Sequence, residues 1–335
     1  MITSLEVEQF IDAQGVIIDV RSPSEYAHAH IPGAFSVPLF SDEERAAIGT
    51  TYKQRSQRHA IDLGLSLAGP KLYHLVDAIR QHIGDSIAKI HCWRGGMRST
   101  FVSNLLSSIK INNVLLSGGY KAFRNWAIDT IAEERNIRIV GGLTGCGKTD
   151  ILVAMARAGG NVLDLEALAN HRGSSFGNIG LPAQPSTEMF ENMLAINLHK
   201  SDRTKPLWVE DESRTIGSCK IPDPFYDMMR AATVYKIEKP LDIRLQNIEK
   251  EYGKLPVEQL VAATKRLEKR LGGDRTNATV AFFNDGKFIE ATTILLEYYD
   301  KTYSFGLGRR ISTIHTMPYT GNAPEQYASM LVSQP

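Results

Sequence analysis

The chain has 335 residues, of which 43% are hydrophobic and 22% are charged. This length exceeds what a single hydrophobic core usually organises, and the composition excludes a disordered or fibrous chain. The formal net charge of +1 at pH 7 neither indicates nor excludes a nucleic-acid partner. Residues 1–8 lack the basic and apolar regions typical of a secretory leader, and no apolar run of about 18 residues occurs, so we expect a cytoplasmic protein that binds no membrane.

In the first part of the chain, short apolar runs alternate with helical patterns. The predicted strands cover residues 16–20, 87–91 and 114–116, and the predicted helices cover 71–82, 100–109 and 126–135. The polar stretch 42–70 favours an elaborated loop with a helix. Strands that alternate with helices indicate a parallel sheet, so we predict a first α/β domain over residues 1–135.

A second alternating series begins near Ile137. Residues 137–140 and 162–165 predict strands, and residues 149–158 predict a helix that Gly159 and Gly160 end. Beyond Asp223 the pattern is mainly helical, over residues 225–271 and 277–303. We therefore predict a second α/β domain over residues 136–335, with a helical C-terminal part and no long linker before it.

A cysteine lies where a predicted strand of the first domain passes into a predicted helix. The loop from His91 to Ser99 contains Cys92, a glycine pair, Arg94 and Arg98. Backbone N–H groups on such a turn and the helix N-terminus stabilise a thiolate, and two arginines would hold an anionic group. We predict that Cys92 is a catalytic nucleophile assisted by Arg94 and Arg98. The alternative is a structural cysteine beside two surface arginines.

The loop itself fits two chemistries. The spacing Cys-x5-Arg from Cys92 to Arg98 is also the pattern of cysteine phosphatases, in which the arginine binds phosphate and the cysteine takes the phosphoryl group. The loop therefore predicts an anion site with a reactive thiol, and the rest of the domain must decide between the two.

The segment that begins at Gly142 satisfies the phosphate-binding pattern G-x-x-x-x-G-K-S/T, between a predicted strand and a predicted helix. Glycines let the backbone N–H groups surround phosphate oxygens, the lysine adds a charge, and the final hydroxyl is a candidate Mg²⁺ ligand. We predict no other tightly bound cofactor. The phosphate-binding residues that we predict are Gly142, Gly145, Cys146, Gly147, Lys148 and Thr149, with the Cys146 side chain filling space.

Acidic and polar residues follow the next predicted strands of this domain. Asp164, Glu210 and Asp211 are candidates for an acid or for holding a metal-bound water, and the alternative is solvated acids at strand ends. In the glycine-rich loop 170–177 and in the segment 212–217, His171, Arg172 and Arg214 are candidate substrate contacts. A surface connection is the alternative for the loop.

The first domain resembles the rhodanese domain. The segments 19–21, 25–26 and 30–34 look like its N-terminal signature, and Gly118-Gly119 with the four residues that follow looks like its C-terminal glycine pair. The resemblance covers about residues 5–130 and implies a rhodanese-like parallel sheet. Ala29 replaces a common glycine, and the active loop is one residue longer than in typical sulfurtransferases, which argues against plain thiosulfate sulfurtransfer.

A rhodanese-like domain with this cysteine loop, followed directly by a P-loop domain, resembles the tRNA 2-selenouridine synthase family. The segments 164–166, 169–177 and 212–217 add to the likeness. The resemblance implies that sulfur at C2 of wobble 2-thiouridine in tRNA is replaced by selenium from selenophosphate, through an S-geranyl-2-thiouridine intermediate made from geranyl diphosphate. It implies that Cys92 carries or guides the selenium, as a selenosulfide anion that Arg94 and Arg98 stabilise.

The resemblance leaves the substrate of the P-loop to be assigned. We expect it to bind the diphosphate of geranyl diphosphate, and the basic stretch from Lys265 to Arg270 is a candidate contact for tRNA phosphates, although a solvated helix face is the simpler interpretation. The alternative function is that of a P-loop NTPase or kinase with a rhodanese or cysteine-phosphatase module.

Overall fold

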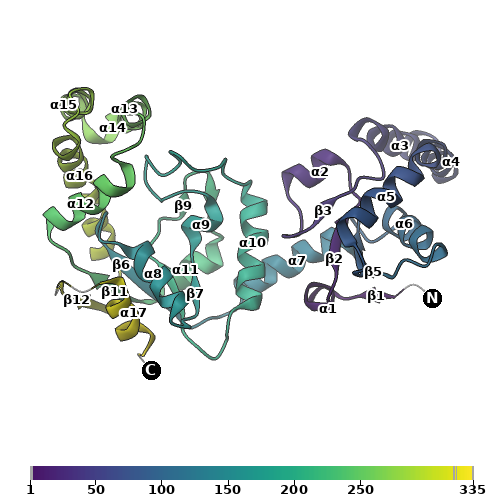
Figure 1. Ribbon diagram of the computed structural model, residues 1–335, viewed down its shortest axis with the longest axis horizontal. Helices are drawn as coiled ribbons and strands as arrows, with labels where there is room; N and C mark the ends of the chain where they lie inside the picture. Colours follow the sequence, from purple (N-terminus) through teal and green to yellow (C-terminus); the bar gives the residue numbers. More distant parts are fainter. Residues whose placement is uncertain (1–2, 320, 322, 334–335) are drawn as a thin grey trace. The chain divides into compact units, whose positions relative to one another are not determined.

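The computed structural model describes residues 3–319, 321 and 323–333, and it divides into two compact units (Figure 1). The first unit contains the chain up to Thr130 together with Glu191–Ile196. The second contains Ile131–Phe190 and the chain from Asn197 onward. The predicted boundary after residue 135 stays a prediction; residues 191–196, which lie in the second predicted domain, belong to the first compact unit.

The first unit is built on a five-stranded parallel sheet of order β1-β5-β4-β2-β3. All four residues of the central strand β4 are buried, as expected when helices cover both faces of a parallel sheet; Ile18 and Ile90 are fully buried. The strands are β1 Ser4–Leu5, β2 Val16–Asp19, β3 Phe35–Ser36, β4 Ala88–His91 and β5 Asn113–Leu116. The helices are α1 Val7–Asp12, α2 Pro23–His28, α3 Asp42–Gln54, α4 Gln57–Ala68, α5 Leu72–Ile83, α6 Met97–Ser108 and α7 Gly119–Ala132, with a 3₁₀ turn η1 at Gly69–Lys71.

The polar stretch that we expected to be an elaborated loop with one helix is instead two packed helices, α3 and α4. Each begins at a serine whose side chain accepts a hydrogen bond from a backbone N–H group of the first turn, Ser41 for α3 and Ser56 for α4. These serine caps were the helix-start signals in the sequence. The pattern was hard to interpret because α3 contains no fully buried residue.

The second unit is built on a parallel sheet of order β12-β11-β6-β8-β7, with β6 in the centre. The strands are β6 Ile137–Gly142, β7 Val162–Leu163, β8 Leu207–Glu210, β11 Thr233–Ile237 and β12 Ile314–Met317, and β9 Thr215–Ile216 pairs antiparallel with β10 Cys219–Lys220. The helices are α8 Lys148–Arg157, α9 Leu165–Ala169, α10 Thr187–Lys200, α11 Asp223–Ala231, α12 Leu241–Tyr252, α13 Val257–Arg266, α14 Glu268–Leu271, α15 Gly273–Asn284, α16 Phe288–Gly308 and α17 Pro324–Val332. The middle of α10, Glu191–Ile196, belongs to the first unit.

Two expectations for the second unit were wrong in detail. Strand β11 interrupts the region predicted to be helical, and it pairs with both β6 and β12. Its β-branched and aromatic residues are typical of a strand, but long helical patterns on both sides hid this short run. The predicted strand 162–165 ends at Leu163, because Asp164 caps the short helix α9 and so places Glu166 on that helix.

The α/β class with two parallel sheets and a helical C-terminal part is confirmed. In the second unit, α17 packs against α8, and its Tyr327 and Leu331 complete the apolar cluster beneath the sheet. A separate apolar cluster joins α13, α15 and α16. Among the described residues, no helix combines the length and the apolar character that crossing a membrane requires.

Candidate functional site

The cysteine loop of the first unit connects β4 to α6 and is held by the backbone at the start of α7. The carbonyl oxygens of Cys92 and Trp93 accept hydrogen bonds of 2.8 Å from the N–H groups of Tyr120 and Lys121. Gly119 lies so close that a Cβ atom there would be 2.3 Å from the Gly95 nitrogen and 2.5 Å from the Cys92 carbonyl oxygen. The glycine pair is therefore needed for a close approach of two backbones.

Cys92 lies at the floor of this loop and is only 3% exposed. Its Sγ is 3.2 Å from Ser99 Oγ and 3.9 Å from the Gly96 carbonyl oxygen. In the described chain, no protein acceptor engages the N–H groups of residues 93–96. The loop can therefore donate several backbone hydrogen bonds to an anion bound beside the thiol.

The two arginines of the loop differ in their surroundings. Arg94 is exposed, whereas Arg98 Nη1 donates to Glu25 Oε2 at 2.8 Å. Arg45 of α3 lies 3.7 Å from the same carboxylate. Burial opposes the negative charge of Glu25, but its hydrogen bond from Arg98 and the charges of Arg98 and Arg45 hold its pKa below the usual value. Glu25 thus holds the Arg98 side chain in the first turn of α6.

A buried ion pair lies behind the cysteine loop. Arg21 and Asp19 are 1% and 0% exposed, with Arg21 Nη2 2.6 Å from Asp19 Oδ2 and 2.7 Å from the Ala29 carbonyl oxygen. The guanidinium lies 3.9 Å from the ring centre of Tyr120. Burial lowers the pKa of His91, which is fully buried beside Asp19, so its imidazole is neutral. The pair lies at the end of β2, and Asp19 is the register partner of His91 at the end of β4, from which the loop departs.

The P-loop of the second unit follows β6, the central strand, and leads into α8. Gly142, Gly145 and Gly147 all have positive φ angles. Cys146 is buried, and its N–H donates to the Leu143 carbonyl oxygen at 3.1 Å. No other N–H group of residues 143–147 has a protein acceptor in the described chain. The loop thus presents the unpaired amides that bind phosphate oxygens.

Helices α12 and α16 hold the outer side of the P-loop. Arg244 Nε donates to the Thr144 carbonyl oxygen, and Asn247 Nδ2 donates to that of Gly145, both at 2.8 Å. Two nitrogens of the Arg244 guanidinium also bind the carboxylate of Asp300. The helical C-terminal part, predicted only as an extension, therefore shapes the phosphate loop.

Asp211, a candidate for an acid or for holding a metal-bound water, is bound by two residues of the C-terminal part. It accepts a hydrogen bond from Tyr303 Oη at 3.0 Å and forms an ion pair with Arg310, which is 0% exposed. Tyr303 Oη in turn accepts from the Gly142 N–H at 2.8 Å. Successive residues at a strand end point to opposite faces, so Asp211 faces away from its two neighbours.

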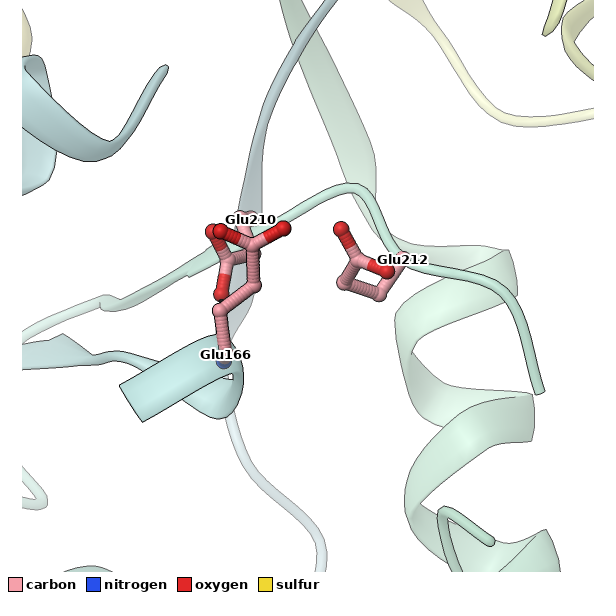
Figure 2. A group of neighbouring side chains, drawn as sticks. All are labelled: Glu166, Glu210 and Glu212. Atoms are coloured by element: carbon pink, nitrogen blue, oxygen red, sulfur yellow. Dashed lines mark hydrogen bonds between the residues drawn. The ribbon is translucent and has the colours of Figure 1, made fainter. Parts of the chain in front are cut away.

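Those neighbours, Glu210 and Glu212, meet Glu166 of α9 in a cluster of carboxylates (Figure 2). One carboxylate oxygen from each lies within 4.8 Å of the others. Glu210 is fully buried; its Oε1 accepts from the Glu166 N–H at 2.8 Å, and its Oε2 has no hydrogen-bond partner among the described residues. Three convergent carboxylates with a buried, unsatisfied oxygen fit a hard divalent cation such as Mg²⁺.

The charges of this cluster are unbalanced. Burial and the charge of Asp164 raise the pKa of Glu166 to about 7, whereas burial and the charge of Glu166 raise that of Glu212 to about 8 and that of Glu210 well above its usual value. Burial opposes the charge of Lys148, but Cys146 and the three glutamates raise its pKa. Lys148 also donates to the Gly142 carbonyl oxygen at 3.2 Å. The lysine therefore stays charged and faces the acids.

The remaining candidates lie around the cluster. Asp164 caps α9, and its charge contributes to the raised pKa values of Glu166 and Glu210. His171 is buried, and burial lowers its pKa. Arg172 is held by Glu251 at 2.6 Å, whereas Arg214 forms ion pairs with acids of α11.

Sequence reasoning missed Glu166 and Glu212 as site residues. The alternation of Glu210 and Glu212 was a usable signal, because positions two apart share a face of a strand. Glu166 carried no such signal, since its segment was interpreted as a strand end. Gly173 of the candidate substrate loop covers the cluster, and a Cβ atom there would lie 2.8–2.9 Å from oxygens of Glu212 and Glu166.

An apolar cavity of about 50 Å³ adjoins the P-loop. Thr144 of the P-loop and Ser174 of the loop over the glutamates line it, together with aromatic and aliphatic side chains of the helical part. That lining contains Phe176, Ile248, Tyr252, Leu260, Phe283, Phe288, Thr292, Leu295, Leu296 and Tyr299. A phosphate loop, a carboxylate cluster and an apolar cavity therefore occur together in the second unit.

Comparison with known proteins gives matches for both units. Residues 3–125 match the family model of the rhodanese-like domain, and residues 135–329 match that of the tRNA 2-selenouridine synthase AAA domain. The tRNA 2-selenouridine synthase of Nitrosomonas europaea is 34% identical, covering 88% of this chain and 89% of its own length. Those of Shewanella piezotolerans and Shewanella halifaxensis are 33% and 34% identical, covering 94% and 89% of this chain and 94% and 90% of their own lengths. The predicted resemblance to a rhodanese domain followed by a P-loop domain is confirmed.

Proposed function

The chain belongs to the tRNA 2-selenouridine synthase family of enzymes, and we propose that it uses its two anion loops for two successive reactions on wobble 2-thiouridine of tRNA. In the first, geranyl diphosphate alkylates the sulfur at C2. In the second, selenium from selenophosphate replaces the geranylated sulfur. The observation that carries this assignment is the presence of a phosphate loop beside an apolar cavity in one unit and a thiol-bearing anion loop in the other.

The P-loop site fits the first reaction. Its unpaired amides and Lys148 would bind the diphosphate, and the apolar cavity beside Thr144 would take the start of the prenyl chain. The 2-thio sulfur attacks C1 of the geranyl group, the C–O bond breaks, and pyrophosphate leaves with its charge stabilised by Lys148. The proton of the thioamide passes to a base.

Mg²⁺ would be held in this unit by carboxylate oxygens of Glu166, Glu210 and Glu212, with the exposed Thr149 hydroxyl as a further ligand for a diphosphate-bound ion. When bound, the ion would neutralise negative charge on the leaving diphosphate. This assignment is consistent with the buried, unsatisfied oxygen of Glu210.

The cysteine loop fits the second reaction. Selenophosphate is a dianion of the size that the open N–H groups of residues 93–96, with Arg94 and Arg98, would bind. Selenium adds to C2, geranylthiolate leaves, and water cleaves the P–Se bond to release phosphate. Cys92 lies at the floor of the loop and would guide the selenium. Alkylation is required first because an S-alkyl group makes the sulfur a leaving group.

Nucleoside mass spectrometry tests the assignment. A 2-thiouridine-containing tRNA is incubated with the full chain, geranyl diphosphate, selenophosphate and Mg²⁺, and the same reaction is run with Cys92→Ser and Lys148→Ala. We expect selenouridine with the wild type, accumulated S-geranyl nucleoside with Cys92→Ser, and unchanged 2-thiouridine with Lys148→Ala. Lys148→Ala should still selenate RNA that already carries the S-geranyl group.

Unchanged nucleosides with folded wild-type protein would contradict the proposal. Nucleotide hydrolysis that survives Cys92→Ser would then favour the alternative of a P-loop NTPase or kinase. Hydrolysis of phosphate esters that Cys92→Ser abolishes, without any tRNA, would favour a cysteine phosphatase.

A further inference from the structure

The first unit contains a second apolar cavity, of about 170 Å³, that neither reaction above uses. Helices α3 and α4 form one wall, the segment after β3 supplies Leu39 and Phe40, and the first turns of α6 supply Met97, Arg98 and Phe101. The walls from α3 and α4 consist of Ile48, Tyr52, Gln57, Ala60, Ile61, Gly64, Leu65 and Ala68. Only Gln57 and Arg98 among the lining residues carry an amide or a charge.

Two residues that line this cavity belong to the same segment of the sequence as the cysteine loop. Met97 and Arg98 line it, and they lie between Gly96 and Ser99, the two residues whose oxygens contact Cys92 Sγ. Arg98 is held at that end by Glu25. The lining therefore combines one fixed cation, in the first turn of the helix that follows the cysteine loop, with side chains that are mainly apolar.

We propose that this cavity binds the geranyl chain of the S-geranyl-2-thiouridine intermediate while selenium is transferred at the cysteine loop. The inference rests on the proposed function, and it adds a specificity site for the alkyl group of the second reaction. An isoprenoid chain matches the lining because it presents no polar atom that would need a partner in the cavity. A phosphate or a nucleobase would leave its polar groups unsatisfied there.

The size of the cavity agrees with this occupant. An apolar cavity of about 150 Å³ is sufficient to hold benzene, so 170 Å³ has room for one five-carbon isoprene unit. The remaining carbons would lie over Tyr52, Leu65 and Met97, whose side chains are 58%, 52% and 58% exposed. Large apolar side chains exposed together at a cavity mouth are typical of a ligand site.

The test is chain-length dependence of selenation. RNA oligonucleotides that carry S-methyl, S-dimethylallyl or S-geranyl-2-thiouridine are incubated with full-length protein and selenophosphate, and kcat/KM is measured for each. The three alkanethiolates are similar leaving groups, so the alkyl chain reports binding. We expect kcat/KM of the wild type to rise at least tenfold from methyl to geranyl, which is ~1.4 kcal/mol, the value of about two buried CH₂ groups.

Ala60→Phe fills the cavity from the buried face of α4. It should lower kcat/KM at least about tenfold for the geranyl substrate and less than about twofold for the methyl substrate. Ala47→Phe is the matched control, because Ala47 is exposed on α3 and does not line the cavity, and it should behave as the wild type. Should Ala60→Phe fail to fold, Leu65→Gln at the exposed mouth is expected to give the same selective loss.

The outcomes separate the two proposals. A folded wild type that selenates none of the three substrates contradicts the proposed function itself. A wild type that selenates all three equally, or an Ala60→Phe variant that folds and keeps the full preference for geranyl, overturns the cavity inference while the proposed function stands.

Discussion

The cysteine loop and the P-loop occupy equivalent places in two different sheets. Each follows a strand with neighbours on both sides, β4 or β6, and each leads into a helix, α6 or α8. In both loops most backbone N–H groups have no acceptor among the residues that the structure describes. The backbone therefore forms a similar anion site in both units, and the two sites differ in the side chains that surround them.

Those side chains come from other parts of each unit. The cysteine loop receives a glutamate from α2 that fixes Arg98, whereas the P-loop receives three glutamates from α9 and the end of β8 that oppose Lys148. One loop is arranged around a thiol and guanidinium groups, and the other around a lysine and a candidate cation site. A common anion loop is thus compatible with two different reactions.

Both loops depend on a buried Asp–Arg pair, and removing its arginine should have the largest effect on stability. Arg310→Met leaves Asp211 buried without a counter-charge, and Arg21→Met does the same to Asp19. Each substitution should lower the free energy of unfolding by ~3–5 kcal/mol. Urea unfolding, monitored by hydrogen exchange, measures the decrease in the free energy of unfolding of each unit. The double variant Asp211→Asn with Arg310→Met should recover much of it; equal losses in single and double variants would contradict the role of the pair.

The cysteine loop packs against Gly119, a glycine from outside the loop. Gly119→Ala places a Cβ atom against backbone atoms of Gly95 and Cys92. We expect this substitution to lower the free energy of unfolding by ~2–3 kcal/mol and to abolish selenation activity. Gly33→Ala is the control, since Gly33 has a φ of +83° but no atom within 4 Å of a new Cβ. Gly33→Ala should lower the free energy of unfolding by only ~1 kcal/mol. Thermal unfolding compares them, and equal losses would rule out the contact as the cause.

The carboxylate cluster should make the second unit sensitive to pH. Raised pKa values of about 7 for Glu166 and about 8 for Glu212 mean that the folded state holds more protons than the unfolded state. Stability without divalent cations is then fully present below pH ~4.5 and is lost as pH rises through 7 and 8. Glu212→Gln removes one charge and should stabilise the protein by ~1–2 kcal/mol at pH 8.5. The melting temperatures of the wild type and of Glu212→Gln, measured from pH 5 to 9, test this prediction. Parallel pH profiles of the two proteins would contradict it.

Divalent cation should have the smallest effect and should act on one unit only. At about ten times its dissociation constant, Mg²⁺ would stabilise the folded state by ~1.4 kcal/mol, which raises the melting temperature by a few degrees. Glu210→Gln should abolish the shift, whereas Cys92→Ser should preserve it. Thermal unfolding at pH 8 with Mg²⁺ or with a chelator provides the measurement. A shift that survives Glu210→Gln would place the ion elsewhere.

Contiguous motifs could be predicted from the sequence because each is one strand, one loop and one helix start. The cysteine loop, the P-loop and the glycine pair at 118–119 all belong to this class. Sites composed of separate segments could not be predicted in the same way. Glu166 and Glu212 are 46 residues apart, and only the pairing of β7 with β8 brings their segments together.

Local patterns also could not show which distant residues bind a candidate side chain. Asp211 had the acidic side chain expected of a metal site, but Tyr303 and Arg310 from the C-terminal part bind it. The amino-acid sequence by itself determined where backbone amides are left open for anions, since local geometry sets this. The tertiary structure alone decided which charges and apolar walls face those amides, because distant segments supply them.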